Sequence, residues 1–149
     1  LLKAKGVNCA KEDIAKVMGT IALIHHKKNE LENAFKCYEE KLDFLTKYLP
    51  DEKLDLAETM YALGKISSKL SKPKGAIKHY FESLNIFKVL GDKAGDKVAS
   101  VLRCISTCYL ALRDLVAALQ CFREYVETCE CRDKVEVLST MGIIHCKLY

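Results

Sequence analysis

Cysteine and histidine are the residues of this chain whose spacing could support chemistry. The 149 residues include eight cysteines and four histidines, and zinc prefers thiolate and imidazole ligands. Two sets of these residues fall close together in the sequence: His25 and His26 with Cys37, and Cys129 and Cys131 with His145 and Cys146. Neither set has the spacing of a standard zinc site, which usually includes paired Cys-x-x-Cys motifs. We therefore predict no metal site and no cofactor.

A cysteine beside a histidine can also act as a thiol nucleophile. Cys37, His79 and Cys121 occupy one position at intervals of 42 residues, so the histidine approaches the cysteines only through adjacent repeats. Packing in the core explains all three residues without catalysis. A glycine-rich phosphate loop, a paired-carboxylate motif and a nucleophile elbow are also missing from the sequence. We predict that the protein is not an enzyme and has no catalytic residue.

These residues belong to a pattern that repeats along the chain. Ala34, Ala76 and Ala118 are 42 residues apart, and such self-similarity is the sign of a repeat architecture. An aromatic residue follows four positions after each alanine and an aliphatic one eight positions after it: Tyr38 and Leu42, Tyr80 and Leu84, Phe122 and Val126. Apolar residues recur every three or four positions, the period of an amphipathic helix, and the period-two alternation of a strand is absent. The sequence therefore predicts an all-α array.

Helical patterns are expected over residues 11–27, 31–48, 52–70, 73–90, 96–112 and 114–129, with a last helix after residue 133. Asp51 and Asp114 are candidate N-caps, Pro73 suits the first turn of a helix, and Gly91 is expected to end one. Residues 1–10 contain Gly6 and Asn8, so they can be either the end of a preceding helix or a frayed entry. The last helix is expected to turn these residues inward: Leu138, Met141, Gly142, Ile144 and His145.

A small residue where two helices meet, followed by an aromatic and then an apolar residue, resembles the tetratricopeptide repeat (TPR). The family's first-helix packing positions fall here on four sets of residues: Met18, Ile21, Ala22 and His25; Met60, Leu63, Gly64 and Ser67; Leu102, Ile105, Ser106 and Tyr109; Leu138, Met141, Gly142 and His145. The long period is similar to the repeats of kinesin light chains and of the Leu-Gly-Asn repeat adaptors. The resemblance implies a right-handed superhelix of antiparallel helix hairpins, an α-solenoid.

The resemblance divides the chain into repeats at residues 11–50, 51–92 and 93–131, with a partial repeat or capping helix at 132–149. We expect a single array that is a fragment of a longer protein. Positions that face the concave surface in the family give our candidate partner-binding residues: Lys16, Leu23, His26, Lys27, Tyr61, Lys65, Lys69, Arg103, Thr107, Leu110 and Ile143. The asparagine ladder of the Leu-Gly-Asn adaptors and the carboxylate clamp of chaperone-binding members are absent from the matching positions.

Lysine and arginine are common in this candidate set, which favours an acidic, extended partner segment. The alternative is that the lysines are only the solvated surface of a basic chain. The net charge of +4 is too small to require nucleic acid as a partner. No apolar run approaches the roughly 18 residues needed to cross a bilayer, and the first residues lack a secretory signal. We therefore expect no membrane insertion.

The cysteines fit buried packing in a reducing compartment better than a disulfide framework, because a chain of this length can build a core. The expected location is therefore intracellular, in the cytoplasm. The predicted function is that of a non-enzymatic scaffold or adaptor that binds a protein or peptide. The alternative is a structural solenoid segment of a large cytoskeletal or ciliary assembly, packing through the second helices of its repeats.

Overall fold

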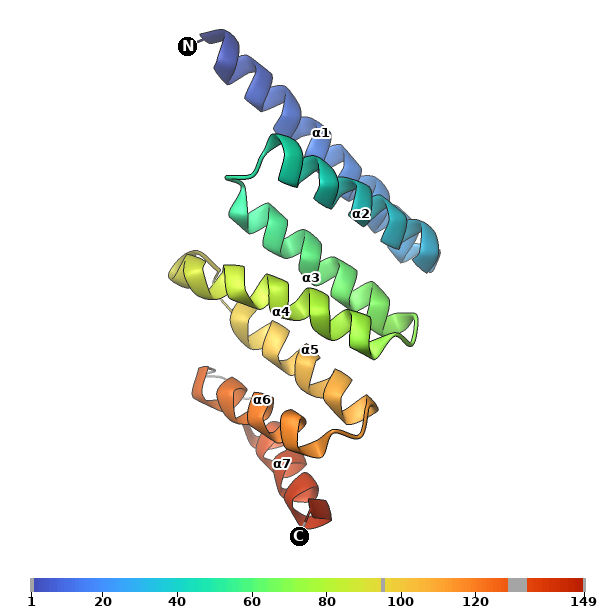
Figure 1. The fold of residues 1–149 in the computed structure, drawn as a ribbon, viewed down its shortest axis with the longest axis vertical. Coiled ribbons are helices and arrows are strands. Elements are labelled where there is room, and N and C mark those ends of the chain that lie inside the picture. The colour runs from blue at the N-terminus through green and yellow to red at the C-terminus, as the bar shows by residue number, and fades with distance from the viewer. Residues whose placement is uncertain (1, 95, 129–133, 149) are drawn as a thin grey trace.

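The computed structural model describes residues 2–94, 96–128 and 134–148. Its described part contains seven α-helices and one 3-10 helix: α1 (Leu2–Lys27), α2 (Leu31–Tyr48), α3 (Lys53–Lys69), α4 (Pro73–Leu90), η1 (Gly91–Ala94), α5 (Lys97–Ala111), α6 (Leu115–Thr128) and α7 (Lys134–Leu148). The helices stack in chain order along an elongated molecule (Figure 1), with the two termini at opposite ends. The all-α prediction is confirmed.

Each helix packs mainly on its neighbours in sequence, which is the organisation of a solenoid. Helices α1 and α2, α3 and α4, and α5 and α6 form three hairpins, and α2 and α4 also pack on the first helix of the next hairpin. A smaller contact joins α3 directly to α5. The first helices of the hairpins therefore form one layer and the second helices another.

The repeated alanines lie where the two helices of each hairpin come together. Ala34, Ala76 and Ala118 are all fully buried, as is Ala22 on the facing helix α1. In the second hairpin the approach is closer, since a Cβ atom added to Gly64 would lie 2.6 Å from the ring of Tyr80. Small side chains thus allow close helix contact at the predicted repeat positions.

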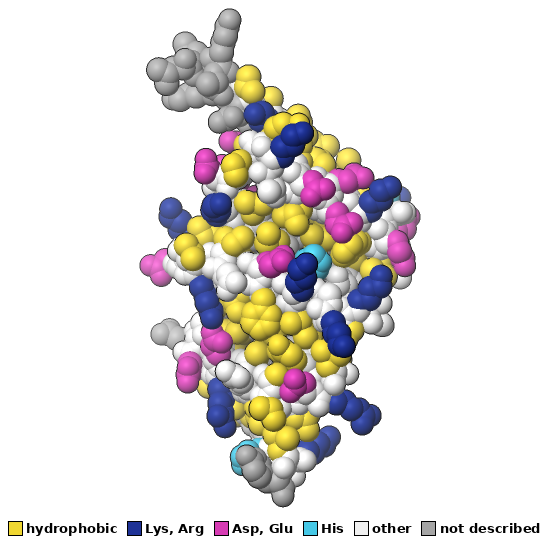
Figure 2. All heavy atoms as spheres, in the orientation of Figure 1, with side chains coloured by type: hydrophobic (Ala, Val, Ile, Leu, Met, Phe, Trp, Pro, Cys, Tyr) yellow, Lys and Arg dark blue, Asp and Glu magenta, His cyan; other side chains and the backbone are white. Residues whose placement is uncertain are grey.

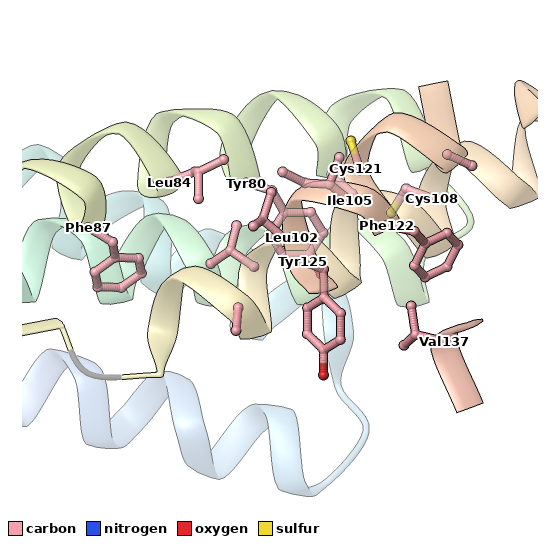
Figure 3. Close-up of a cluster of buried hydrophobic side chains, with 14 of the residues drawn as sticks. Tyr80, Leu84, Phe87, Leu102, Ile105, Cys108, Cys121, Phe122, Tyr125 and Val137 are labelled. Carbon is pink, nitrogen blue, oxygen red and sulfur yellow. The ribbon is translucent and has the colours of Figure 1, made fainter. Parts of the chain in front are cut away.

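The largest cluster of buried apolar residues spans the second half of the chain. Figure 3 shows side chains from α4, α5, α6 and α7 that point into one shared interior. Tyr80 and Phe87 of α4, Leu102 and Ile105 of α5 and Phe122 of α6 are at most 4% exposed. Because this cluster includes residues from four successive helices, it fixes the curvature of the array on which the concave surface depends.

Most predicted helix ends agree with the structure. The Oδ1 atom of Asp114 accepts a hydrogen bond from the backbone N–H of Ala117 at 3.1 Å, Pro73 opens α4, and Gly91 follows its last residue with a φ of 55°. The N-cap prediction for Asp51 is wrong. Its backbone carbonyl accepts a hydrogen bond from Lys53 within the turn, so the residue that precedes α3 is Glu52, which makes no side-chain cap.

Two other expectations differ from the structure. Helix α1 already begins at Leu2, so Gly6 and Asn8 do not interrupt it. In α7 the buried residues are Val137 and Ile144, while Leu138 is 52% exposed. Gly142 and His145 are also exposed, and Met141 is half-buried.

The register of α7 explains this second difference. Val137 and Ile144 correspond to Val101 and Cys108 of α5, at the 36-residue interval that relates Ser106 to Gly142. Those residues of α5 are buried in the cluster that α4, the preceding helix, shares with it. Leu138 lies on the other face, which in the earlier repeats packs against the second helix of the same hairpin. The described chain contains no such helix after α7, so this face stays exposed.

Candidate binding groove

Hollows lie between successive first helices of the solenoid, on the layer formed by α1, α3, α5 and α7. The first hollow has a volume of about 350 Å³ and lies between α1 and α3, above two residues of α2. Its lining combines polar, charged and apolar side chains: Lys16, Gly19, Thr20, Leu23, Tyr38, Lys41, Asp55, Glu58, Thr59 and Ala62. Lys16 and Leu23 are the two predicted binding residues among them.

A buried lysine lies beneath the first hollow. Lys41 of α2 is only 8% exposed, and its ammonium is 2.6 Å from Oδ1 of Asp55 on α3. Gly19 of α1 leaves room for this side chain, because a Cβ atom there would lie 3.1 Å from the Lys41 Nζ. The ion pair therefore ties α2 to α3 while the lysine stem fills the space under α1.

The charge around the first hollow is mixed. Asp55 and Glu58 of α3 offset the cations Lys16 and Lys41. Glu58 also pairs with Lys97 of α5 at 3.1 Å, which links two successive first helices. A uniformly acidic ligand would meet carboxylates here, so this part of the groove is better suited to an apolar or uncharged side chain.

The second and third hollows continue along the same layer. The second, about 350 Å³, lies near the C-terminal ends of α3 and α5 and is lined by Ser68, Ser71, Pro73, Thr107, Cys108 and Ala111. The third, about 510 Å³, lies between α5 and α7 and is lined by Leu110, Arg113, Leu115, Thr140, Ile143, Ile144 and Lys147. Its floor is apolar and it carries two cations, so it can hold an apolar side chain next to a carboxylate.

Cationic side chains connect the first hollow to the second. The ammonium of Lys69 donates a hydrogen bond to Nε2 of His26 at 2.9 Å, and this contact spans α3 and α1. Burial lowers the pKa of His26, and the neighbouring charges of Lys69 and Lys65 lower it further. His26 is therefore a neutral acceptor at physiological pH, and the positive charge of this cluster belongs to the two lysines.

Tyr61 forms a fixed part of the groove wall. Its ring centroid is 5.8 Å from that of Tyr80, and its hydroxyl oxygen is 3.7 Å from the sulfur of Cys104. Burial raises the pKa of Tyr61, with the nearby Cys104 adding to the shift. The ammonium of Lys65 lies 5.4 Å from the Tyr61 ring centroid, a distance at which a cation is attracted to the ring face.

Four of the predicted cations have no carboxylate partner. Among the described residues, no Asp or Glu side chain lies within ion-pair distance of these residues: Lys27, Lys65, Lys69 and Arg103. The exposed Lys16 is 3.7 Å from Asp13, which is a weak surface pair. Unpaired cations on the first helices leave a positive potential that internal ion pairs do not neutralise.

The structure gives each predicted binding residue a place on the first-helix layer. Lys16 and Leu23 line the first hollow, Thr107 the second, and Leu110 and Ile143 the third. The connecting cluster holds His26, Tyr61, Lys65 and Lys69. Lys27 and Arg103 are exposed side chains at the ends and edges of their helices.

Sequence reasoning missed Lys41, Asp55 and Arg113. Lys41 lies between Tyr38 and Leu45 on the buried stripe of α2, and a lysine at a position with core spacing was the available signal. Asp55 needed the fold, because its partner Lys41 is 14 residues away on another helix. Arg113 follows α5 in a left-handed backbone conformation, with a φ of 60°, which no sequence pattern indicated.

The metal-ligand sets considered from the sequence are not assembled into a site in the described chain. His25 bonds Glu30 at 2.5 Å through Nδ1, whereas His26 accepts from Lys69. Cys129 and Cys131 of the second set lie outside the described residues. Within the described ranges, three or more potential ligands do not come together, and no helix there is long and apolar enough to cross a membrane.

Comparison with known proteins identifies the fold. No family model matches the chain, and no curated protein matches its sequence. BtubC (BKLC) from P. vanneervenii superposes with a TM-score of 0.79 and 18% identity over 91% of this chain, which spans 56% of that protein. The TPR domain of Arabidopsis FLU has a TM-score of 0.70 and 18% identity, covering 79% of this chain and 96% of that domain.

A third similar structure is the putative kinesin light chain from Podosopora anserina, described as having nearly identical TPR-like repeats. It has a TM-score of 0.69 and 11% identity, and the match covers 87% of this chain and 64% of that protein. At such low identities the similarity establishes the fold. The chain is a TPR-like α-solenoid, as the repeated alanines and their aromatic partners predicted.

Proposed function

We propose that the protein is a non-enzymatic interaction scaffold whose first-helix groove holds an extended partner segment. The observation that carries this proposal is the sequence of three hollows along α1, α3, α5 and α7, joined by cations that no described carboxylate neutralises. Hollows of this spacing suit apolar anchor side chains, and the cations suit acidic residues between them. Thermodynamically, anchors supply most of the affinity and charges supply orientation and association rate.

The distribution of charge refines the partner's expected pattern. Asp55 and Glu58 beside the first hollow oppose an acidic residue there. Lys65 and Lys69 favour one near the middle of the groove, and Arg113 with Lys147 favours another beside the third hollow. We therefore expect an apolar residue at the α1 end of the bound segment and acidic residues towards the α7 end.

The thiols support a non-catalytic role. Burial raises the pKa of the Cys108 and Cys121 thiols, whereas a nucleophilic cysteine needs a lowered pKa. His79 packs edge-on against Phe35, with ring centroids 6.1 Å apart. Its Nδ1 atom is buried without a hydrogen-bond partner, so its place in the core is that of a packing residue.

A charge-reversal experiment tests the groove. The probe is a fluorescein-labelled 12-residue peptide in which Leu and Phe anchors are interspersed with Asp and Glu, titrated into the protein at several salt concentrations. Affinity should fall as salt rises, because exposed charges are screened beyond about 8–10 Å at physiological ionic strength. Lys65→Glu with Lys69→Glu should weaken binding at least about tenfold, as two attractive contacts become repulsive.

The matched control reverses the same charge elsewhere. Lys36 and Lys78 are exposed on the second helices α2 and α4, so Lys36→Glu with Lys78→Glu changes the net charge equally without touching the groove. Probe binding should be almost unchanged in this variant. If both double variants bind equally, or if affinity is constant across salt, the lysines are only solvated surface and the proposed groove is wrong.

A second candidate function is lateral packing through the second helices in a large assembly. It is favoured by exposed apolar residues on α4 and α6: Val89 is 89%, Val116 66% and Phe81 38% exposed. Figure 2 shows hydrophobic side chains gathered at several places on one face of the molecule. Association with a native complex that persists in the Lys65→Glu and Lys69→Glu variant but is lost with Phe81→Asp and Val89→Asp would support this candidate instead.

A further inference from the structure

Helix α1 exposes a continuous apolar stripe on the side that faces away from the rest of the solenoid. The stripe, which we call the α1 end face, consists of Val7, Ile14, Val17, Ile21 and Ile24, each between 45% and 58% exposed. Their spacing of three, four and seven residues places them on one side of the helix. Helix α1 forms the upper boundary of the molecule in Figure 1, and Figure 2 shows hydrophobic side chains along this boundary.

The repeat gives an internal control for this exposure. Forty-two residues later, Ile14, Val17, Ile21 and Ile24 correspond to residues of α3 that are at most 6% exposed: Leu56, Thr59, Leu63 and Ile66. In α5 the last three positions hold residues that are at most 3% exposed: Val101, Ile105 and Cys108. The same surface is thus buried in both interior first helices and open only in α1.

The molecule also shows what covers this surface when it is buried. Leu56 of α3 packs in a cluster with Leu45 and Leu49 of α2 and its link, and Leu63 and Ile66 pack with Tyr38 of α2. The equivalent residues of α5 share a cluster with Tyr80, Leu84 and Phe87 of α4. In each case the cover is an amphipathic helix with an aromatic residue followed by large apolar residues at helical spacing.

We propose that the α1 end face is the docking site for an amphipathic helix of a partner protein, bound as α2 binds α3. The stripe from Val7 to Ile24 is about 25 Å long at 1.5 Å per residue, which requires a partner helix of about five turns. That helix should carry an aromatic or large aliphatic residue and further apolar residues at positions like those of Tyr38, Leu42, Leu45 and Leu49. Its remaining faces are exposed and polar.

Terminal repeats of a solenoid normally present a polar outer surface, because nothing else covers it. The α1 end face is apolar instead, and an exposed stripe of this kind marks an interaction site. The binding surface also lies on the opposite side of α1 from Ala22, the fully buried residue that packs against α2. Docking therefore needs no rearrangement of the first hairpin.

A second copy of the chain is a poor occupant. The helices of the covering type are α2, α4 and α6, and their apolar stripes are already buried: Tyr38, Leu45, Tyr80, Phe87, Phe122 and Tyr125 are at most 9% exposed. A copy could offer them only by unfolding its own solenoid.

A helix delivered by a repeat-like turn within this chain is also a poor occupant. Residues 49–52 form the short link that brings α2 to α3, and residues 7–10 occupy the equivalent positions before α1. Those residues are helical and continue α1. The end face is therefore free for a helix supplied by another protein.

The chain itself provides a probe for this site. A fluorescein-labelled peptide with the sequence of residues 31–50 carries the side chains that cover α3, and a lactam between Lys36 and Glu40, both exposed and four residues apart, holds it helical. Titrated into the full chain, it should bind saturably and protect the backbone amides of α1 from hydrogen exchange. A control peptide with Tyr38→Asp and Leu45→Asp should not bind.

Variants of the full chain complete the test. Val17→Asp with Ile21→Asp places two charges in the stripe and should weaken peptide binding at least about tenfold. Val89→Asp makes the same chemical change on the exposed side of α4 and should leave binding unchanged. Because all three residues are largely exposed, these variants should keep their helical content and unfolding midpoint within a few degrees.

Three results would overturn the proposal. The first is a peptide that neither binds nor protects α1, and the second is binding that is equal in the end-face and Val89→Asp variants. The third is a chain that dimerises in sedimentation velocity and becomes monomeric only with Val17→Asp and Ile21→Asp, because a second copy would then be the occupant. None of these results depends on the groove, whose probe and variants are separate.

Discussion

Replacing Gly64 by alanine tests the helix contact at the centre of the second hairpin. A Cβ atom at this position would lie 2.6 Å from both Cδ1 and Cε1 of the Tyr80 ring. The ring is 2% exposed and packs against Tyr61 with the two centroids 5.8 Å apart. It therefore has no solvent-filled space into which it can withdraw, and either Tyr61 or helix α4 must move with it.

The size of the effect follows from two opposing contributions. Overpacking a core contact costs about 1–3 kcal/mol, and replacing a helical glycine by alanine returns up to about 1 kcal/mol. The ring must shift by roughly 0.8 Å to restore an ordinary contact of 3.4 Å, which places the cost in the upper half of that range. The net loss should be about 1–2 kcal/mol, or a fall of about 2–8 °C in the melting temperature of a domain this size.

The measurement is thermal and urea unfolding followed by circular dichroism. Gly142 is the matched control, since it occupies the equivalent position in α7 and an added Cβ there meets nothing within 4 Å. Gly142→Ala should leave the midpoint unchanged or raise it. A Gly64→Ala protein at least as stable as the unmodified chain would show that α3 and α4 are further apart than the structure has them.

Three further outcomes are expected. Ala76→Leu should lower the unfolding midpoint clearly, because overpacking this fully buried contact costs about 1–3 kcal/mol; an unchanged midpoint would contradict the repeat register. Lys41→Ala should cost about 1–3 kcal/mol by removing both the buried stem and the partner of Asp55, whereas Lys41→Met should recover part of that loss. Burial lowers the pKa of His26 and His79, so the unfolded chain binds more protons below pH 6.5, and stability should fall as the pH drops through that value. Substituting both histidines by glutamine should flatten this pH dependence in urea titrations.

The fold could be predicted because one alignment supplied most of the information. Once Ala34, Ala76 and Ala118 were recognised as equivalent, the facing positions and the order of the hairpins followed from helical periodicity. The N-cap of α3 could not be predicted in this way. Both Asp51 and Glu52 are acidic residues before a helix, and only the backbone hydrogen bonds of the turn decide which one precedes α3.

The groove was less predictable than the fold. The predicted cations came from repeat positions, and these positions say which side of a helix a residue occupies but not which charges neighbour it. Asp55 and Glu58 come from the same helix as Lys65, yet they change the character of the first hollow. Their effect depends on how α1 and α3 are placed in space, which no single helix encodes.

The last helix shows the same distinction. Its apolar residues occur on two faces, so periodicity alone could not say which face is buried. The interior helices α3 and α5 bury both the face that meets the preceding helix and the face that meets their own partner. Helix α7 buries only the first face, through Val137 and Ile144, and α1 buries only the second, through Ala22. The two ends of the chain are therefore open in opposite senses.

This asymmetry separates the effects of the two proposed ligands on stability. The free energy of a solenoid is approximately a sum of repeat stabilities and nearest-neighbour interfaces. A helix on the α1 end face adds one interface at one end, so it should protect α1 and α2 from hydrogen exchange and leave α5 to α7 almost unaffected. A segment in the groove contacts successive first helices, so its protection should extend from α1 to α7. Because each ligand stabilises the chain by an amount set by its own concentration and affinity, the two increments should add when both surfaces are occupied.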